Sequence, residues 1–397
     1  MESSDGIAKL FSDELGKHGV WSKYRLWSTE KKEKPAEERR EDDTDEDIQT
    51  SERTDFKDVL LPRESSLHIV ANAKNVKIIH NETTRVAKMI LDAVKDGSID
   101  HIYFKAQKQH PVGNDEDTLN WIFLLDSINF SFWPDEGQHY DVMLDGELQT
   151  GYFAACAAIN NAMKKGVPVT SAEWMATVQK DELDEILKSH SGHSIPLLDE
   201  RLKAINSSGK ALLEYFNGSF FSVIREGKFD ALEILRLVIK YFPSFRDFAI
   251  FEGRKVSLLK RAQILIADAH GALENHENGQ TIKGIDKLTM FADYRVPQAL
   301  AFLGVLEYSQ NLLDVLNKKE LLENGSDEEV ELRGFSIAAC EEIVNQMNTL
   351  VSSCDEYNNV RPLTAIEVDY YLWLYRRRHA KEIEEKIPFH RTRCIFY

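Results

Sequence analysis

The stretch that decides the fold runs from Leu288 to Leu300 and reads LTMFADYRVPQAL. Pro297 suits the first turn of a helix and apolar residues follow it, so FADYR (291–295) is predicted to be the loop that leads into a helix. Asp293 lies in this loop, where the free amides of a helix start and a ligand can both be reached. We interpret Asp293 either as a helix cap bonded to its own backbone, or as a ligand-binding carboxylate with Phe291 stacked on the same flat ligand.

Most of the chain after residue 153 has the 3.6-residue hydrophobic period of α-helices. This period predicts helices at 153–165, 181–188, 197–216, 229–241, 257–273, 297–317, 328–352 and 364–386. Between Tyr140 and Tyr152 the sequence is YDVMLDGELQTGY, and Asp145-Gly146 is a favoured two-residue turn between short strands. The sequence therefore predicts a mainly helical protein with one small β-hairpin.

The first 55 residues differ in composition from the rest of the chain. They contain 10 Lys or Arg against 16 Asp or Glu, a net charge of −6 that leaves −11 of the total −17 for the remainder. Residues 29–55 are almost wholly charged and polar, and such a segment cannot bury enough surface to offset its ordering entropy. We predict a disordered acidic extension at 1–55, with a docking tail as the alternative, and a folded domain at 56–397 that has room for two lobes.

Composition also argues against several classes of protein. Binding to a DNA or RNA polymer gains affinity by neutralising phosphates, which an acidic body does poorly. The four cysteines are scattered without a CxxC pair, and His190 and His193 have no further ligands at metal-site spacing, so neither a disulfide framework nor a zinc site is indicated. No segment resembles a signal peptide or a membrane span. We expect a cytoplasmic protein, with the nucleus as a second compartment, that acts on a small molecule.

Basic residues follow a glycine turn in FEGRKVSLLKRAQIL (251–265). We expect Lys255, Lys260 and Arg261 on the helix after the turn, where they form either a solvated face or a phosphate site, since paired basic donors suit a phosphate dianion. The motif NFSFW, which ends at Trp133, has aromatic residues at alternate positions. That pattern indicates a buried strand or core corner, with an aromatic wall beside a ligand as the alternative.

The segment TAIEVDYYLWLY (364–375) predicts a helix that carries a carboxylate among apolar and aromatic residues. Thr364 and Glu367 have the spacing of a capping box, which puts Asp369 in the second turn. Asp369 and Trp373 are four residues apart and share a neighbouring face. Because such a carboxylate is costly to bury unpaired, Asp369 is either paired with an Arg or a backbone amide, or is a functional acid.

Seven short motifs carry a resemblance to a known family. They are NFSFW (129–133), TSA (170–172), FPSFRD (242–247), KRAQIL (260–265), TMFADYRVPQ (289–298), DYYLW (369–373) and PFHRTRCIFY (388–397). Together they resemble the queuosine salvage family of queuosine 5'-phosphate N-glycosylase/hydrolases, in order from about Leu60 to Tyr397. The resemblance implies a fold similar to the helix-hairpin-helix type of DNA glycosylase. It also implies hydrolysis of the N-glycosidic bond of queuosine 5'-phosphate, with release of queuine for reuse in transfer RNA. Neither a metal nor an organic cofactor is implied.

Carried over to this sequence, the resemblance also implies a site. It places Phe291, Asp293, Asp369 and Tyr370 in the base and ribose pocket. Asp369 is expected to be the catalytic carboxylate on the ribose side, and Asp293 is expected to accept hydrogen bonds from the guanine-like edge of the base. The further residues expected to bind substrate are Tyr294, Arg295, Trp373, Lys260, Arg261 and Trp133, with Lys260, Arg261 or Arg295 as ligands of the phosphate.

One departure from the family and two alternative functions stay open at this point. Family members can carry a second acid five residues after the aspartate of DYYLW, where this chain has Leu374. If that acid is catalytic in them, either Asp369 suffices here or another carboxylate substitutes. A glycosylase that acts on a base within a nucleic acid is one alternative, but it needs a positive groove. The other is a non-catalytic binding protein for modified nucleosides, in which both aspartates are structural.

Overall fold

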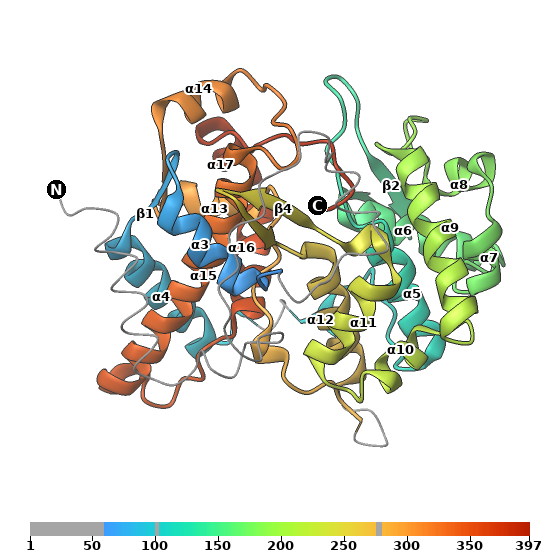
Figure 1. The fold of residues 1–397 in the computed structure, drawn as a ribbon, viewed down its shortest axis with the longest axis horizontal. Helices are drawn as coiled ribbons and strands as arrows, with labels where there is room; N and C mark the ends of the chain where they lie inside the picture. The colour runs from blue at the N-terminus through green and yellow to red at the C-terminus, as the bar shows by residue number, and fades with distance from the viewer. Residues whose placement is uncertain (1–58, 100–102, 275–279) are drawn as a thin grey trace. The chain divides into compact units, whose positions relative to one another are not determined.

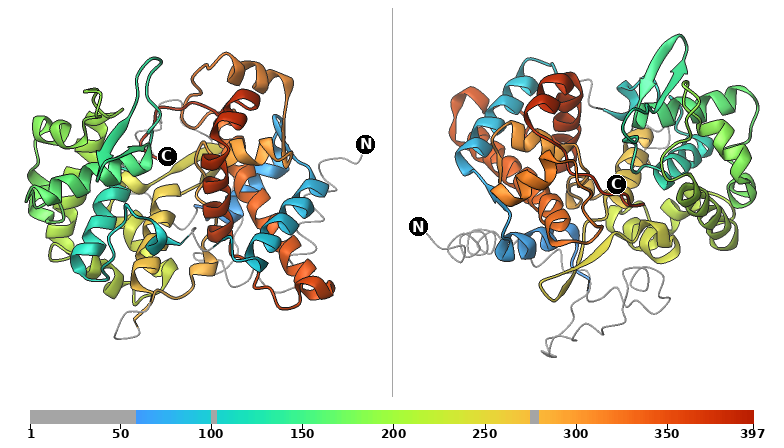
Figure 2. Two further views of the ribbon diagram at one scale, coloured as in Figure 1. Left: turned by 180° about the vertical axis from the view of Figure 1, so that it is seen from behind. Right: turned by 90° about the horizontal axis from the view of Figure 1, so that it is seen from above.

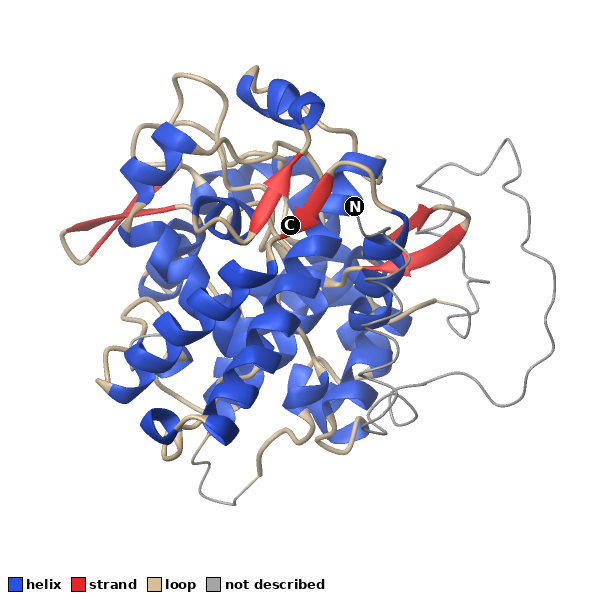
Figure 3. Cartoon of the chain, turned by 90° about the vertical axis from the view of Figure 1, so that its left-hand side faces the viewer, coloured by secondary structure: helices blue, strands red, loops and turns tan. Residues whose placement is uncertain are grey.

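The computed structural model describes residues 59–99, 103–274 and 280–397, most of which are helical (Figure 3). The predicted acidic extension at 1–55 lies outside the described residues. The described chain divides into two compact units, each assembled from segments that are distant in the sequence. The first unit contains 59–99, 247–259 and 289–392, and the second contains 103–246, 260–274, 280–288 and 393–397.

The first unit is built mainly of helices, with two pairs of short strands (Figure 1). Its helices are α3 (Pro62–Asn72), α4 (His80–Lys95), α13 (Val296–Phe302), α14 (Gln310–Asn317), α15 (Asp327–Ser353), α16 (Ala365–Arg378), α17 (Ala380–Lys386) and the 3-10 turn η7 (Asp355–Tyr357). Its antiparallel strand pairs are β1 (Val76–Ile78) with β6 (Leu306–Tyr308), and β4 (Phe248–Phe251) with β5 (Arg254–Ser257).

The second unit is also built mainly of helices, and its described residues contain one pair of strands. Its helices are α5 (Glu116–Ser127), α6 (Tyr152–Lys164), α7 (Ala172–Thr177), α8 (Lys180–Leu187), α9 (Leu198–Tyr215), α10 (Phe220–Glu226), α11 (Ala231–Tyr241), α12 (Lys260–Leu273) and the 3-10 turns η4 (Phe104–Ala106), η5 (Pro243–Phe245) and η6 (Ile285–Lys287). Its strands are β2 (Asp141–Leu144) and β3 (Glu147–Thr150).

The long helix α15 is the centre of the first unit. Its start is capped by Ser326, whose side chain accepts from the backbone N–H of Glu329. It packs against α3 and α4 on one side and contacts α13 and α16 (Figures 1 and 2). Gly334 allows the close approach to α3, because a Cβ at this position would lie 2.6 Å from the Cδ1 atom of Ile69.

The second unit packs around α5, α9 and α12. Phe123 of α5 contacts the rings of Phe220 and Phe242 with centroids 5.1 and 4.9 Å away, which places an aromatic cluster at the core. Gly209 lets α9 approach α7, because a Cβ there would overlap the backbone of Met175 and Ala176.

The predicted hairpin is confirmed. Leu144 pairs with Glu147 across the turn, and Asp145 and Gly146 have φ of 49° and 86°, the left-handed conformations that a type I′ turn requires. The prediction of one β element was nevertheless incomplete. The β4–β5 hairpin has the same kind of turn at Glu252-Gly253, where the sequence predicted only a glycine turn before a helix.

Several predicted helices have different ends in the structure. The predicted helix at 257–273 begins at Lys260, and Lys255 lies on β5 rather than on a helix. The predicted helix at 297–317 is wrong, because α13 ends at Phe302 and β6 separates it from α14. The apolar period continues through this break because β6 is short and both its end residues, Leu306 and Tyr308, are buried, so its residues fit either pattern. The predicted helix at 364–386 likewise divides at His379 into α16 and α17.

Within the described part of the chain, no helix combines the length and apolar character that crossing a bilayer demands.

The capping box predicted at the start of α16 is present. Thr364 Oγ1 accepts from the N–H of Glu367 at 3.3 Å, and the Glu367 carboxylate accepts from the N–H of Thr364 at 2.9 Å.

We predict that Thr364→Ala lowers the free energy of unfolding by about 1 kcal/mol, the usual value of an N-cap. The matched control is Thr349→Ala on the exposed side of α15, where the hydroxyl only bonds back to the carbonyl of Asn345. Urea unfolding of both variants measures the difference, and equal losses would contradict the cap assignment.

Candidate functional site

The loop before α13 is the centre of the candidate site. Pro297 lies in the first turn of α13, as predicted. The Oδ1 atom of Asp293 accepts from the backbone N–H groups of Arg295 at 2.7 Å and Val296 at 2.9 Å, so the helix-cap interpretation is confirmed for this oxygen. Asp293 is 9% exposed, and within the described residues its Oδ2 atom accepts no hydrogen bond. One oxygen of this carboxylate is therefore fixed by the backbone while the other stays available.

Helix α16 brings the second predicted carboxylate to the same loop. Asp369 is 4% exposed, and its Oδ1 atom accepts from the backbone N–H of Phe291 at 3.1 Å. The ring of Phe291 meets the ring of Tyr370 edge to face, with centroids 5.6 Å apart. Phe291 is only 2% exposed, whereas Tyr370 is partly exposed. The structure thus brings together the four residues that the resemblance places in the base and ribose pocket.

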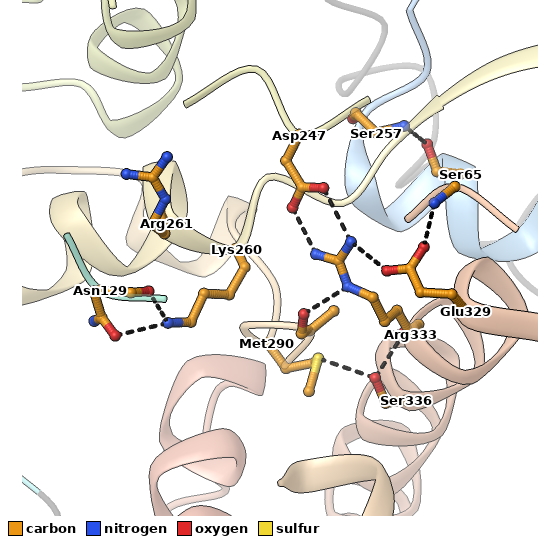
Figure 4. Close-up of polar contacts among 12 residues, drawn as sticks. Ser65, Asn129, Asp247, Ser257, Lys260, Arg261, Met290, Glu329, Arg333 and Ser336 are labelled. Atoms are coloured by element: carbon orange, nitrogen blue, oxygen red, sulfur yellow. Dashed lines mark hydrogen bonds and ion pairs between the residues drawn. The ribbon is translucent and has the colours of Figure 1, made fainter. Parts of the chain in front are cut away.

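Helix α15 holds the same loop through contacts that were not predicted from the sequence. Thr289 donates its hydroxyl to Glu341 Oε1 at 2.6 Å, and the carbonyl of Ala292 accepts from Arg333 Nε at 2.9 Å. Between them, Ser336 Oγ donates to the sulfur of Met290 at 3.6 Å (Figure 4). The available signal was a set of polar residues inside the apolar stretch of this helix.

Three other predicted residues of the first unit have neighbours of their own. Arg295 lies over the rings of Tyr294 and Phe389, at 4.9 and 4.3 Å, and its Nη1 atom is 2.8 Å from a carboxylate oxygen of Glu384. Trp373 is partly exposed on α16, with the guanidinium of Arg377 5.1 Å above its ring. Both cations therefore have a ring partner, and Arg295 has a charge partner as well.

In the second unit, Lys260 and Arg261 are buried at the C-terminal end of α5. Lys260 Nζ donates at 2.9 Å to both the backbone carbonyl and the side-chain oxygen of Asn129 (Figure 4). Arg261 donates to the carbonyls of Asp126 and Ser127, at 3.3 and 2.7 Å. The last carbonyls of α5 have no donor within the helix, and together with the negative end of the helix dipole they favour cations at its C-terminal end.

These contacts decide between the two interpretations of the basic cluster only in part. A solvated face is wrong for Lys260 and Arg261, which are 6% and 1% exposed. Whether either side chain also contacts a phosphate stays a prediction.

The aromatic motif NFSFW is a core corner in the second unit, as the first interpretation predicts. Phe130, Phe132 and Trp133 are all buried. The guanidinium of Arg393 lies 3.4 Å from the centre of the Trp133 ring and donates to its backbone carbonyl at 2.7 Å. Ser131 donates its N–H to the carbonyl of Tyr397 at 2.8 Å. The end of the chain is thereby bonded to this motif.

Asp126 is a buried acid on α5 whose carboxyl is acted on by the charges of Lys260 and Arg261. Its Oδ1 atom accepts from Asn129 Nδ2 at 2.9 Å, while Oδ2 is buried and has no hydrogen-bond partner within the described residues. Burial raises the pKa of Asp126 to about 7, against the opposing effects of the Asn129 hydrogen bond and the charges of Lys260 and Arg261. Asp126 therefore changes its charge near neutral pH.

Comparison with known proteins identifies the family. The sequence model described as "Queuosine salvage protein" matches residues 109–397 of this chain. The chain belongs to the queuosine salvage protein family. A relative from Bos taurus, named queuosine 5'-phosphate N-glycosylase/hydrolase, is 41% identical over 341 residues, which cover 85% of this chain and 99% of that protein.

Relatives with the same name from Mus musculus and Schizosaccharomyces pombe are 40% and 34% identical, over 85% and 83% of this chain and 99% and 97% of their own lengths. The resemblance of the short motifs to the queuosine salvage family is therefore confirmed.

We predict a pH-dependent stability difference between the wild type and Asp126→Asn. The unfolded carboxyl ionises near pH 4 but the folded one near pH 7, so the native state holds an extra proton between these values and loses stability as pH rises through the window. Asn carries no such proton. Relative to the wild type, the variant should gain up to about 4 kcal/mol in free energy of unfolding between pH 4 and pH 7.

Urea unfolding at pH 4, 5.5 and 7 measures this gain. Asp117→Asn is the control, since Asp117 is exposed on the same helix. A difference between Asp126→Asn and the wild type that does not change with pH would contradict the raised pKa.

Proposed function

We propose that this protein hydrolyses the N-glycosidic bond of queuosine 5'-phosphate and releases queuine for reuse in transfer RNA. The three relatives compared above are named queuosine 5'-phosphate N-glycosylase/hydrolase and align with this chain over nearly their full lengths. The structural observation that carries the proposal is the hydrogen bond from Phe291 N–H to Asp369, because it attaches one acid to the loop that contains the other, Asp293.

The chemistry of queuine explains why two acids are needed. Queuine is a 7-deazapurine, with carbon in place of the basic nitrogen N7 that purine glycosidases can protonate to improve the leaving group. The enzyme must therefore stabilise an oxocarbenium-like ribose strongly and withdraw electron density through the six-membered ring by hydrogen bonds.

We assign Asp369 to the ribose side of the reaction. A buried carboxylate with one oxygen fixed by a backbone N–H is preorganised, so its charge requires no reorganisation when positive charge develops on the sugar. Leu374, which stands where family members can have a second acid, supplies no charge. Asp369 is therefore proposed to carry the catalytic role on this helix alone, as electrostatic stabiliser, nucleophile or base for water.

We assign Asp293 to the guanine-like edge of the base. Its Oδ1 atom already accepts two backbone N–H groups, so Oδ2 is the oxygen proposed to accept from N1–H and the exocyclic amine. A negative group near the base also suits the secondary ammonium in the side chain of queuine. The cap holds the carboxylate in one orientation, which is what recognition of a planar edge requires.

The aromatic residues are proposed to contact the substrate to different extents. Phe291 was expected to stack on the base, but its deep burial leaves little of its ring face free. Tyr370 and Trp373 are partly exposed and offer more ring surface. Tyr294 is buried beneath Arg295 and is proposed to shape the pocket from behind. Trp133 of the second unit stays a candidate from the sequence.

For the phosphate, Lys260 is our first candidate among the three basic residues. Its ammonium is a compact charge that donates to the backbone carbonyl and the side-chain oxygen of Asn129. The charge of the Arg261 guanidinium is instead spread over donors to three backbone carbonyls, and the guanidinium of Arg295 pairs with Glu384. The preference for Lys260 rests on these contacts and on the sequence.

We further propose that the helical body has the helix-hairpin-helix DNA-glycosylase type of fold, and that the protein acts in the cytoplasm, with the nucleus as a second compartment. The mainly helical structure with two-stranded sheets supports the first proposal. The acidic net charge supports a mononucleotide substrate rather than a nucleic-acid polymer.

Incubation of the purified protein with queuosine 5'-phosphate, followed by mass spectrometry, tests the activity. Free queuine is the expected product. Release of a base from an oligonucleotide instead would favour a nucleic-acid glycosylase, and binding without turnover would favour a carrier of modified nucleosides.

Asp369→Asn should lower turnover by roughly a hundredfold to a thousandfold, the usual effect of losing one preorganised electrostatic contact. The amide keeps the size of the side chain and an oxygen that accepts from Phe291 N–H, so the fold and the affinity for free queuine should change little. Asp293→Asn is the reciprocal control and should weaken queuine binding. Near wild-type turnover by folded Asp369→Asn would overturn the catalytic assignment.

Queuosine without its phosphate should have a kcat/KM about tenfold to a hundredfold lower than queuosine 5'-phosphate, since each hydrogen bond to a charged group contributes about 1.5–3 kcal/mol. Lys260→Met should remove most of this preference, and Lys255→Met on β5 should keep it. Equal kcat/KM of the wild type for both compounds would argue against a phosphate site, and an unchanged preference in Lys260→Met would move that site elsewhere.

A further inference from the structure

Arg333 of α15 is an almost fully buried cation, 1% exposed, that contacts three separate parts of the first unit (Figure 4). Its Nη1 and Nη2 atoms donate to the two carboxylate oxygens of Asp247, at 3.0 and 2.6 Å, in a bidentate pair just before β4. Nη1 also donates to Glu329 Oε1 at 3.0 Å, one turn earlier on α15. Its Nε atom donates to the carbonyl of Ala292 at 2.9 Å.

The two carboxylates fix the plane of the guanidinium. A bidentate pair allows one orientation of the fork, and Glu329 is itself held because its Oε2 atom accepts from the N–H of Gly325 at 3.1 Å. Asp247 and Glu329 are both buried. The Nε–H of Arg333 therefore points in one direction, and the group it meets is the peptide that joins Ala292 to Asp293.

The loop backbone is consequently held on both sides of Ala292. Phe291 donates its N–H to Asp369 on one side, and the Ala292 carbonyl accepts from Arg333 on the other. The next residue is Asp293, whose Oδ1 atom caps α13. With the peptides 290–291 and 292–293 held and Oδ1 bonded to the start of α13, these contacts restrict where the remaining carboxylate oxygen of Asp293 lies.

We infer that Arg333 is a positioning residue for base recognition: through the carbonyl of Ala292 it sets where Asp293 meets the edge of queuine. This inference rests on the proposed function, since it takes Asp293 as the group that binds the base. Arg333 is buried behind the loop and acts through it, so its loss should move the loop rather than remove a contact with substrate.

Lysine cannot replace arginine in this role. An ammonium keeps the positive charge near Asp247 and Glu329 but has no planar fork that can hold one carboxylate with two donors and a carbonyl with a third. Arg333→Lys therefore separates the geometry from the charge. A displacement of about 1 Å in a catalytic constellation can cost on the order of a hundredfold in rate.

The experiment compares Arg333→Lys with Glu331→Gln, a matched control on the same helix. Glu331 is as deeply buried as Arg333, but it accepts from the N–H groups of Lys74 and Asn75, at 3.0 and 2.6 Å, and so faces β1 instead of the loop. The measurements are kcat and KM for queuosine 5'-phosphate, the Kd of free queuine, the melting temperature, and hydrogen exchange of the peptide that covers 288–300.

We expect Arg333→Lys to lower kcat/KM about a hundredfold, to weaken queuine binding at least tenfold, and to speed exchange in 288–300. Glu331→Gln should lower the melting temperature while the other three readouts stay within about threefold of the wild type. Folded Arg333→Lys with wild-type queuine affinity and wild-type exchange would overturn the inference, and so would equal losses in both variants.

Two further outcomes are decided by one more variant, Asp247→Asn, and by the wild type. If Arg333→Lys does not fold, Asp247→Asn decides, because it keeps Arg333 but removes the charge that orients the fork; wild-type queuine affinity in Asp247→Asn then overturns the inference. If the wild type releases no queuine from queuosine 5'-phosphate, the proposed function fails, and the exchange measurement alone decides whether Arg333 fixes the loop.

Discussion

The buried interaction of Arg333 with Asp247 and Glu329 is the constraint on which the first unit depends. Breaking a buried ion pair by removal of one partner typically costs about 3–5 kcal/mol, because a charge is left uncompensated away from water. Here the same guanidinium connects α15, the start of β4 and the loop before α13. Its positive charge also acts on His390, whose pKa burial and Arg333 together lower to about 3, so that this histidine is neutral. Stability and loop position thus have one common origin.

In the second unit, buried cations bind backbone carbonyls, whereas Arg333 in the first unit binds carboxylates as well. Between Asp126 and Ser131, every backbone carbonyl accepts a hydrogen bond from Arg261, Lys260 or Arg201. These carbonyls lie at and after the C-terminal end of α5, where helix geometry leaves them without intrahelical donors. The rings of Phe130 and Phe132 face the Arg201 guanidinium, 4.3 and 5.1 Å away. These cations, of which Lys260 and Arg261 belong to the basic cluster of the sequence and Arg201 comes from α9, therefore satisfy the carbonyls where a helix ends inside the core.

The proposed chemistry depends on how little freedom the loop 289–296 retains. Polar contacts from α15, from α16 and from its own Asp293 hold the loop, and Arg295 near its end pairs with Glu384 of α17. A rigid support of this kind suits a reaction in which the leaving group has no N7 to protonate, since stabilisation must come from charges already in place. The same rigidity accounts for the burial of Phe291, which supports the loop more than it offers a surface to a base.

The sequence by itself determined the elements whose signals are local. The capping box at Thr364, the Asp145-Gly146 turn and Pro297 at the start of α13 each depend on neighbouring residues, and the structure has all three. The short motifs identified the family and predicted that Asp369 and the Asp293 loop belong together.

Tertiary structure decided what depends on partners distant in the sequence. Strand β1 pairs with β6, for example Val76 with Tyr308, and no turn connects the two strands that the sequence could have shown. Glu329 and Arg333 have the four-residue spacing of an ordinary surface ion pair on a helix. Only the packing of α15 against β4 and the loop buries this pair and makes it a support for the site. The reason is that spacing is fixed by the sequence, whereas burial depends on the whole fold.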